Sequence, residues 1–227
     1  MRLRVSMGLV VLAFVGGGSS PLQVQRFDNV VRDDFFAGMS GDTARFDRAM
    51  KTCEEALAEN PKNAAALVWH GAGLLVRSDI AFRRGDRDSG MTLRARALRE
   101  MKDAIAMSPS DVQVLIPRAA ILVSSARFAP VDQSREMART AAADYEEVLA
   151  IEAPYASTLG THSKGELLGG LATAYRLGGE DDKAISYLTR MTKELPGTLY
   201  DQKAQKWLAD LRAVPRDDHF CIGCHVQ

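Results

Sequence analysis

Three residues near the C-terminus have the types and spacing that hold a metal centre. Cys221, Cys224 and His225 form the sequence CIGCH, in which two residues separate the thiols and an imidazole follows the second thiol directly. Two thiols at this spacing can bond to the two vinyl groups along one edge of a porphyrin. The adjacent imidazole then reaches the iron from the proximal side. The sequence therefore predicts covalent haem c at Cys221 and Cys224, with His225 as an axial iron ligand.

This motif resembles the haem-attachment site of c-type cytochromes, and two other uses of the same thiols stay open. A zinc site normally needs four ligands, and His219 is the nearest residue that would supply a fourth. A redox disulfide of the CxxC type normally opens a helix in an α/β fold, which the rest of the sequence does not predict. Haem is the favoured prediction, and zinc or a disulfide is the alternative.

The distal side of the predicted haem needs a ligand from elsewhere in the chain. Small cytochromes c usually take their distal methionine from residues after the motif, but here only Val226 and Gln227 follow it. The upstream candidates are His70, His162 and His219. We expect either ligation by His162, which lies in the segment STLGTHSKGE, or an open distal site. Coordination by two histidines would give a lower potential than the His/Met pair of electron carriers.

Residues 1–20 have the three-part layout of a secretory signal peptide. Arg2 and Arg4 precede an apolar run over 5–15, and small residues follow at 16–20. The apolar run is well short of the ~20 residues that a membrane-spanning helix needs. We therefore expect an exported, periplasmic protein with no membrane span after signal cleavage. Haem of the c type is attached outside the bacterial cytoplasm, so this expectation agrees with the terminal motif.

Composition excludes several functional classes. The chain has 227 residues, 46% of them hydrophobic, with 29 basic and 29 acidic residues and no net charge. A nucleic-acid-binding protein would show a basic excess, so no nucleic-acid partner is expected. Three cysteines are too few for a disulfide scaffold. No Ser-His-Asp order, phosphate-binding loop or supported carboxylate pair is found, so we do not expect an enzyme.

The chain contains four similar segments, each ending in a proline that closes an amphipathic helix. Successive prolines are 48, 45 and 42 residues apart, and they are Pro61, Pro109, Pro154 and Pro196. Before each proline, apolar residues recur at intervals of three and four, as in Ala184, Leu188 and Met191. No segment alternates with a period of two, so strands are not predicted.

The last segment, LATAYRLGGEDDKAISYL, resembles the tetratricopeptide repeat (TPR), and the resemblance extends over residues 30–197. It implies an all-α, TPR-like helical-hairpin solenoid with about four repeats, some with lengthened helices, and a short irregular C-terminal tail. The implied organisation is a signal peptide at 1–20, a repeat domain at 21–212 and the motif-bearing tail at 213–227. The matching positions are Leu168, Leu171, Ala172, Tyr175, Ala184 and Leu188.

The resemblance also implies an inner groove that binds a protein segment. Its expected lining is apolar, and the alternative is that these longer helices are packed on all sides. The lining residues are Val68, Ala72, Leu75, Ile116, Ala120 and Val123. His70 and Arg118 occupy positions where leucine is usual. We expect His70 to be a hydrogen-bonded core residue, and Arg118 to form an internal ion pair, for instance with Glu146.

Taken together, these patterns predict an exported TPR scaffold that carries covalent haem and serves electron transfer or assembly in a periplasmic redox complex. It would bind a protein through its groove and exchange electrons with a redox partner. The arginine-rich stretch at 83–99 is either a solvated helix face or a surface that steers an acidic partner. The alternative is a non-redox periplasmic adaptor whose tail cysteines form a disulfide or bind zinc. Cys53 falls at a core position and is not expected to react.

Overall fold

The computed structural model describes residues 26–214, and all regular structure in that range is helical. The all-α prediction is therefore confirmed. Short turns join successive helices, and two 3-10 turns, η1 (Ala153–Tyr155) and η2 (Leu211–Ala213), follow α6 and α9. The α-helices are α1 (Asp28–Met39), α2 (Thr43–Glu59), α3 (Ala64–Arg83), α4 (Arg87–Met107), α5 (Val112–Ala126), α6 (Val131–Glu152), α7 (Thr161–Gly178), α8 (Asp181–Glu194) and α9 (Leu199–Ala209).

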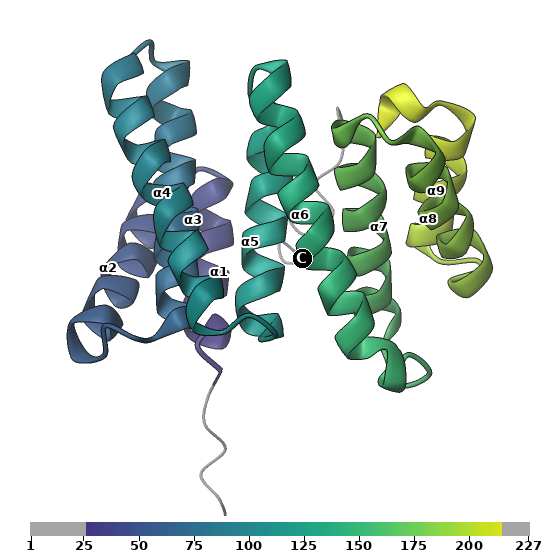
Figure 1. Ribbon diagram of the computed structural model, residues 1–227, viewed down its shortest axis with the longest axis horizontal. Coiled ribbons are helices and arrows are strands. Elements are labelled where there is room, and N and C mark those ends of the chain that lie inside the picture. Colours follow the sequence, from purple (N-terminus) through teal and green to yellow (C-terminus); the bar gives the residue numbers. More distant parts are fainter. Residues whose placement is uncertain (1–25, 215–227) are drawn as a thin grey trace, which may run out of the picture.

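The helices pack as a row of antiparallel hairpins (Figure 1). Within the row, α1 pairs with α2, α3 with α4, α5 with α6, and α7 with α8, and α9 packs against α8. Each odd-numbered helix also contacts the next odd-numbered helix, which joins the hairpins side by side. The predicted helical-hairpin arrangement is present, while the repeat family and the number of repeats stay predictions.

Local sequence signals set the ends of these helices. Helix α2 ends at Glu59 and α8 at Glu194, two residues before Pro61 and Pro196 in each case. The other two closing prolines stand at the same distance from the ends of α4 and α6. Several helices begin at a side chain that accepts a backbone N–H of the first turn, as Asp42 does from Arg45 at 3.0 Å. The extra length of the middle segments lies in α3, α4 and α6, which have 20, 21 and 22 residues.

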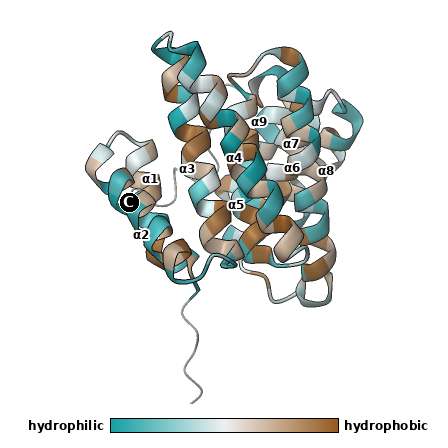
Figure 2. Ribbon diagram, turned by 60° about the vertical axis from the view of Figure 1, so that its left-hand side comes forward, coloured by the Kyte–Doolittle hydropathy of each residue, from teal (hydrophilic) through white to brown (hydrophobic). Residues whose placement is uncertain are grey.

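Two clusters of buried apolar side chains hold the row together. The larger one runs from α1 to the start of α8, and α3 and α5 are the most apolar helices that feed it. Figure 2 shows apolar stretches on α3, whereas α2 and α4 carry hydrophilic ones. The smaller cluster joins α7, α8 and α9, with Trp207 and Val214 among its fully buried residues. Packing thus continues through Val214, two residues past the expected domain boundary, which itself stays a prediction.

Candidate functional site

Most of the predicted site residues lie outside the described part of the chain. Cys221, Cys224, His225 and His219 fall after residue 214, and the predicted signal peptide falls before residue 26. The haem-attachment motif, its alternatives and the export signal therefore stay predictions. What the structure supplies is the place where the tail begins and the surroundings of His162 and His70.

The tail starts beside the C-terminal end of α7. The Arg176 side chain donates a hydrogen bond from Nε to the Leu211 carbonyl oxygen at 3.1 Å, and the same guanidinium pairs with Asp181 at 3.2 Å. Three residues further on, Val214 is fully buried in the smaller apolar cluster. These contacts fix the root of the tail against α7 and α9, seven residues before Cys221.

His162 is the second residue of α7 and takes part in a three-residue hydrogen-bond network. Its Nδ1 atom lies 2.8 Å from the Tyr200 hydroxyl oxygen, and that hydroxyl donates to Glu166 Oε1 at 2.8 Å. Because the phenolic proton points to the carboxylate, the phenolic oxygen accepts a hydrogen bond from Nδ1–H of His162. This assignment of Nδ1 as the donor follows from the network.

A donating Nδ1 is compatible with the distal role that the sequence predicts for His162. A neutral imidazole with a lone pair on one nitrogen is the form that ligates metals, and ligating histidines usually donate their other N–H to a neighbouring oxygen. His162 belongs to the exposed residues of α7. The donor chemistry therefore agrees with the expected distal role of His162, which stays a prediction.

Two features position Tyr200 in this network. Its ring lies against Gly165, where a Cβ atom would stand 2.4 Å from ring carbons, so the close approach requires glycine. Thr198 begins α9 by accepting a backbone hydrogen bond from Asp201 at 3.3 Å, which places Tyr200 in the first turn. The starts of α7 and α9 thus lie together, and their ends meet through Arg176, so the two helices run parallel.

His70 is a core residue, as expected. Its side chain is 4% exposed, with Nδ1 2.6 Å from Glu100 Oε2 and Nε2 3.7 Å from Glu54. Burial acts to raise the pKa of Glu100, but hydrogen bonds from His70 and Arg96 outweigh it, so this pKa lies below its ordinary value. Both ring nitrogens of His70 therefore face carboxylates inside the helix row.

Cys53 is also a core residue, as expected. It is fully buried in α2. Burial raises the pKa of its thiol to about 12, and the nearby carboxylates Glu54 and Glu100 act in the same direction. A thiol with such a pKa stays protonated near neutral pH and is a poor nucleophile.

The expected partner of Arg118 was wrong. Arg118 forms an internal ion pair, but with Asp144 rather than Glu146, and its Nε donates to the Asp144 carboxylate at 2.7 Å. Two residues along α6 turn a side chain by about 200°, so Glu146 faces another neighbour. Glu146 instead accepts hydrogen bonds from the hydroxyls of Tyr175 and Tyr187, each at 2.7 Å.

The residues expected to line an apolar groove are mostly interior. Of the six, Val68, Ala72, Leu75 and Val123 are buried in the main cluster. Ile116 is exposed by 40%. These four positions agree with the alternative of close packing, although Ile116 leaves one side of α5 open to solvent. These four residues therefore provide no apolar surface for a partner.

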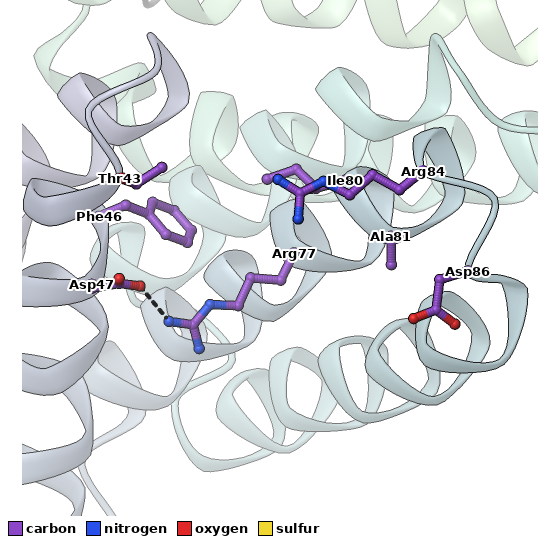
Figure 3. A pocket seen from close by; sticks show the side chains of 8 residues that line it. All are labelled: Thr43, Phe46, Asp47, Arg77, Ile80, Ala81, Arg84 and Asp86. Atoms are coloured by element: carbon purple, nitrogen blue, oxygen red, sulfur yellow. Dashed lines mark hydrogen bonds and ion pairs between the residues drawn. The ribbon is translucent and has the colours of Figure 1, made fainter.

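A cleft of about 330 Å³ lies between α2, α3 and the start of α4 (Figure 3). Arg77 reaches across it to donate to Asp47 at 2.8 Å, and the guanidinium lies over the ring of Phe46. Arg84 and Asp86 complete the charged part of the lining. Its two arginines are matched by two aspartates, so the cleft has no clear preference for ligands of either charge.

Comparisons with known proteins add no relative to this description. Neither a family model, nor a curated protein, nor a solved structure gives a significant match to the chain. Among residues 26–214, no helix combines the length and apolar character needed to cross a membrane. Within the same range, no three His, Cys, Asp or Glu side chains are grouped so as to hold a metal ion.

Proposed function

We propose that this chain is an exported, TPR-like scaffold that carries covalently attached haem c and serves electron transfer or assembly in a periplasmic redox complex. The observation that carries the proposal is the CIGCH sequence at 221–225. The signal-like segment at 1–20 supports it, because haem of the c type is attached outside the bacterial cytoplasm. The row of helical hairpins supports the scaffold part, since stacked hairpins offer extended surfaces to proteins.

Each motif residue has a distinct role in this proposal. Cys221 and Cys224 would hold the porphyrin through thioether bonds, and His225 would ligate the iron. When bound, haem supplies one-electron exchange between ferric and ferrous iron. The helical body would dock the redox partner, while the tail, rooted at Val214, presents the haem beside it.

A covalent haem assay tests the proposal directly. The protein is expressed with its signal segment in a host that has a cytochrome c maturation system, and a denaturing gel is stained for haem peroxidase activity. We expect a stained band that disappears in the Cys221→Ala/Cys224→Ala variant. Cys53→Ala is the matched control, because it removes a cysteine outside the motif and should keep the stain. A purified wild-type protein without covalent haem would overturn the proposal.

The second candidate is a non-redox adaptor whose tail cysteines form a disulfide or bind zinc. The helical-hairpin row is equally compatible with it, because stacked hairpins offer surfaces to proteins with or without haem. Metal analysis and thiol titration of the same purified protein separate the cases. Zinc at one ion per chain, or two thiols that titrate only after reduction, supports the adaptor.

A further inference from the structure

We propose that the exposed face of α4 binds the same face of a second copy of this chain, with the two helices antiparallel about a two-fold axis at Ala95. The proposal goes beyond haem attachment and does not depend on it. Among the described elements, α4 packs mainly against α3, which covers one side of the helix. The opposite side is exposed from Arg87 to Asp103, or about 24 Å at ~1.5 Å per residue.

The middle of this face is apolar. Met91, Ala95 and Leu98 follow one another at intervals of four and three, which places them in one row along the helix. Met91 is exposed by 53% and Leu98 by 38%. The small alanine between them lets a second helix approach closely, since the distance between two packed helices depends on the side chains at their crossing point. The row therefore suits a helical partner.

Both ends of the apolar row carry one cation and one anion. The four residues are exposed, and they are Arg87, Asp88, Lys102 and Asp103. Within the described part of the chain, none of their side chains forms an ion pair or a hydrogen bond. Each end of the face thus offers two charges to a partner.

A two-fold axis at Ala95 pairs these charges with opposite signs. Arg87 and Asp103 each lie eight residues from the axis, and Asp88 and Lys102 each lie seven. In the antiparallel arrangement, Arg87 therefore lies beside Asp103 of the second copy, and Lys102 beside Asp88 of the second copy. Two-fold symmetry makes each pair occur twice. A parallel arrangement would instead place each charge beside its own copy, so the charges specify the antiparallel one.

The apolar row is complementary to itself about the same axis. Met91 lies four residues before Ala95 and Leu98 three residues after it, so each Met91 lies against Leu98 of the second copy. The neighbouring Arg99 can pack its aliphatic stem on the same methionine. One helix face offers a smaller contact than the ~1,200–2,000 Å² of stable interfaces, so we expect a weak, reversible dimer.

The charges favour a second copy over an anionic membrane or a strongly acidic protein. Asp88 and Asp103 belong to the same exposed face as the cations. Lipid phosphates or the carboxylates of a partner would repel both aspartates, although they would attract Arg87 and Lys102. A self-complementary face has no such conflict.

Sedimentation velocity of the purified full chain tests the charge pairs, with a reductant present and over about a hundredfold range of concentration. Arg87→Asp and Asp103→Arg should each raise the dissociation constant of the dimer at least about tenfold, because each places like charges across the axis. An equal mixture of the two variants should form a heterodimer about as tight as the wild-type dimer, since every pair is then opposite again. Arg135→Asp, at an exposed arginine of α6, is the control and should match wild type.

Disulfide cross-linking locates the axis. In the Cys221→Ala/Cys224→Ala background, Ala95→Cys should give a covalent dimer on oxidation, because the axis brings its two copies together. Ala106→Cys is the control, since it lies on the same exposed face but eleven residues from the axis, and it should stay monomeric. Absence of haem affects neither measurement, so the proposed function and this proposal fail separately.

Three results would overturn the proposal. The first is a wild-type chain that stays monomeric at every concentration. The second is a dimer that both charge reversals leave intact, because it would use another face. The third is a monomer that binds phosphatidylserine vesicles and loses them in Leu98→Asp, which would assign the face to a membrane.

Discussion

The ring of Tyr200 occupies the space that a side chain at Gly165 would need. A Cβ atom at position 165 would lie 2.4 Å from two ring carbons, closer than real Cβ contacts come. These carbons, Cγ and Cδ1, lie near the point where the ring is attached, so they cannot move away unless the whole side chain moves. The glycine therefore sets how closely α9 approaches α7, and with it the position of the hydroxyl beside His162.

Gly165→Ala should separate these helices and lower stability. We expect the free energy of unfolding to fall by about 1–3 kcal/mol, the usual effect of adding a methyl group to a packed interface. Urea denaturation followed by circular dichroism measures it. Gly178→Ala on the same helix is the control, since a Cβ there meets no atom closer than 3.9 Å. Equal stability of the two variants would contradict the packing described for Tyr200.

Removing the Asp144 carboxylate should lower the free energy of unfolding, because Arg118 then loses its ion-pair partner. Burial raises the pKa of Asp144, and Arg118 offsets this only in part. Asp144→Ala leaves the largely buried Arg118 side chain without its partner, and we expect a loss of about 3 kcal/mol. Arg118→Met/Asp144→Ala should recover at least half of that loss, because no charge is then left buried. A double-mutant cycle in urea measures the coupling, and additive losses would contradict it.

Asp34 should make stability depend on pH at acidic values. Hydrogen bonds from Arg48 and, after it, Arg45 lower the pKa of Asp34 to about 2, against 3.8 for the free side chain. A lowered folded-state pKa stabilises the fold above pH 3.8, and the gain is lost as the pH falls toward 2. Both arginines are partly exposed, so we expect Asp34→Asn to cost only about 1 kcal/mol at pH 7.

The Asp34 effect is checked by urea unfolding at several pH values. The difference between wild type and Asp34→Asn should shrink between pH 4 and pH 2. The neighbouring Asp33, whose side chain is 76% exposed, supplies the control Asp33→Asn, with little change at any pH. A constant difference from pH 7 to pH 2 would rule out the carboxylate of Asp34 as its source.

The two described histidines should respond to substitution in opposite ways. His70→Ala removes a buried ring and its hydrogen bond to Glu100, so we expect a loss of about 2–4 kcal/mol with an unchanged haem spectrum. His162→Ala should change the haem spectrum and leave stability within about 1 kcal/mol, because its ring is exposed. Unfolding curves and absorption spectra of the two haem-loaded variants provide the test.

Truncation should show where the packed body ends. A chain ending at Val214 keeps every described residue of the smaller apolar cluster, so we expect it to be as stable as the full chain. A chain ending at Arg212 lacks the fully buried Val214 and should be about 1–2 kcal/mol less stable, though still folded. Thermal unfolding of both chains measures the difference. Unfolding of the longer truncated chain would show that later residues belong to the core.

Local signals made much of the fold predictable. Prolines at fixed places after each apolar pattern, such as Pro61 and Pro196, marked the ends of α2 and α8 correctly. The end of a helix is set by residues that are close together in the sequence, so it can be predicted without the structure. The core positions of Cys53 and His70 followed for the same reason, because helical spacing assigns a face to each residue.

Contacts between helices were harder to predict. The partner of Arg118 depends on how α6 is rotated about its axis relative to α5. Helical spacing within one segment does not reveal that rotation, so it could not distinguish Asp144 from Glu146. The network of His162 and Tyr200 joins residues 38 apart and depends on α7 and α9 running parallel. The expected groove failed at Val68 for a related reason, since the neighbouring hairpins bury that position.

The smaller apolar cluster has a dynamic consequence. Helix α9 is held by this cluster at one side of the helix row, and it contributes Tyr200 at its start and leads directly into the root of the tail at its end. Among the described elements, α9 packs mainly against α8, and elements at the edge of a fold can open at a lower free energy than the whole fold. A transient detachment of α9 would thus break the His162 hydrogen bond and loosen the tether at Val214 in one event. Amide protons of α9 should accordingly exchange together, and faster than those of α3.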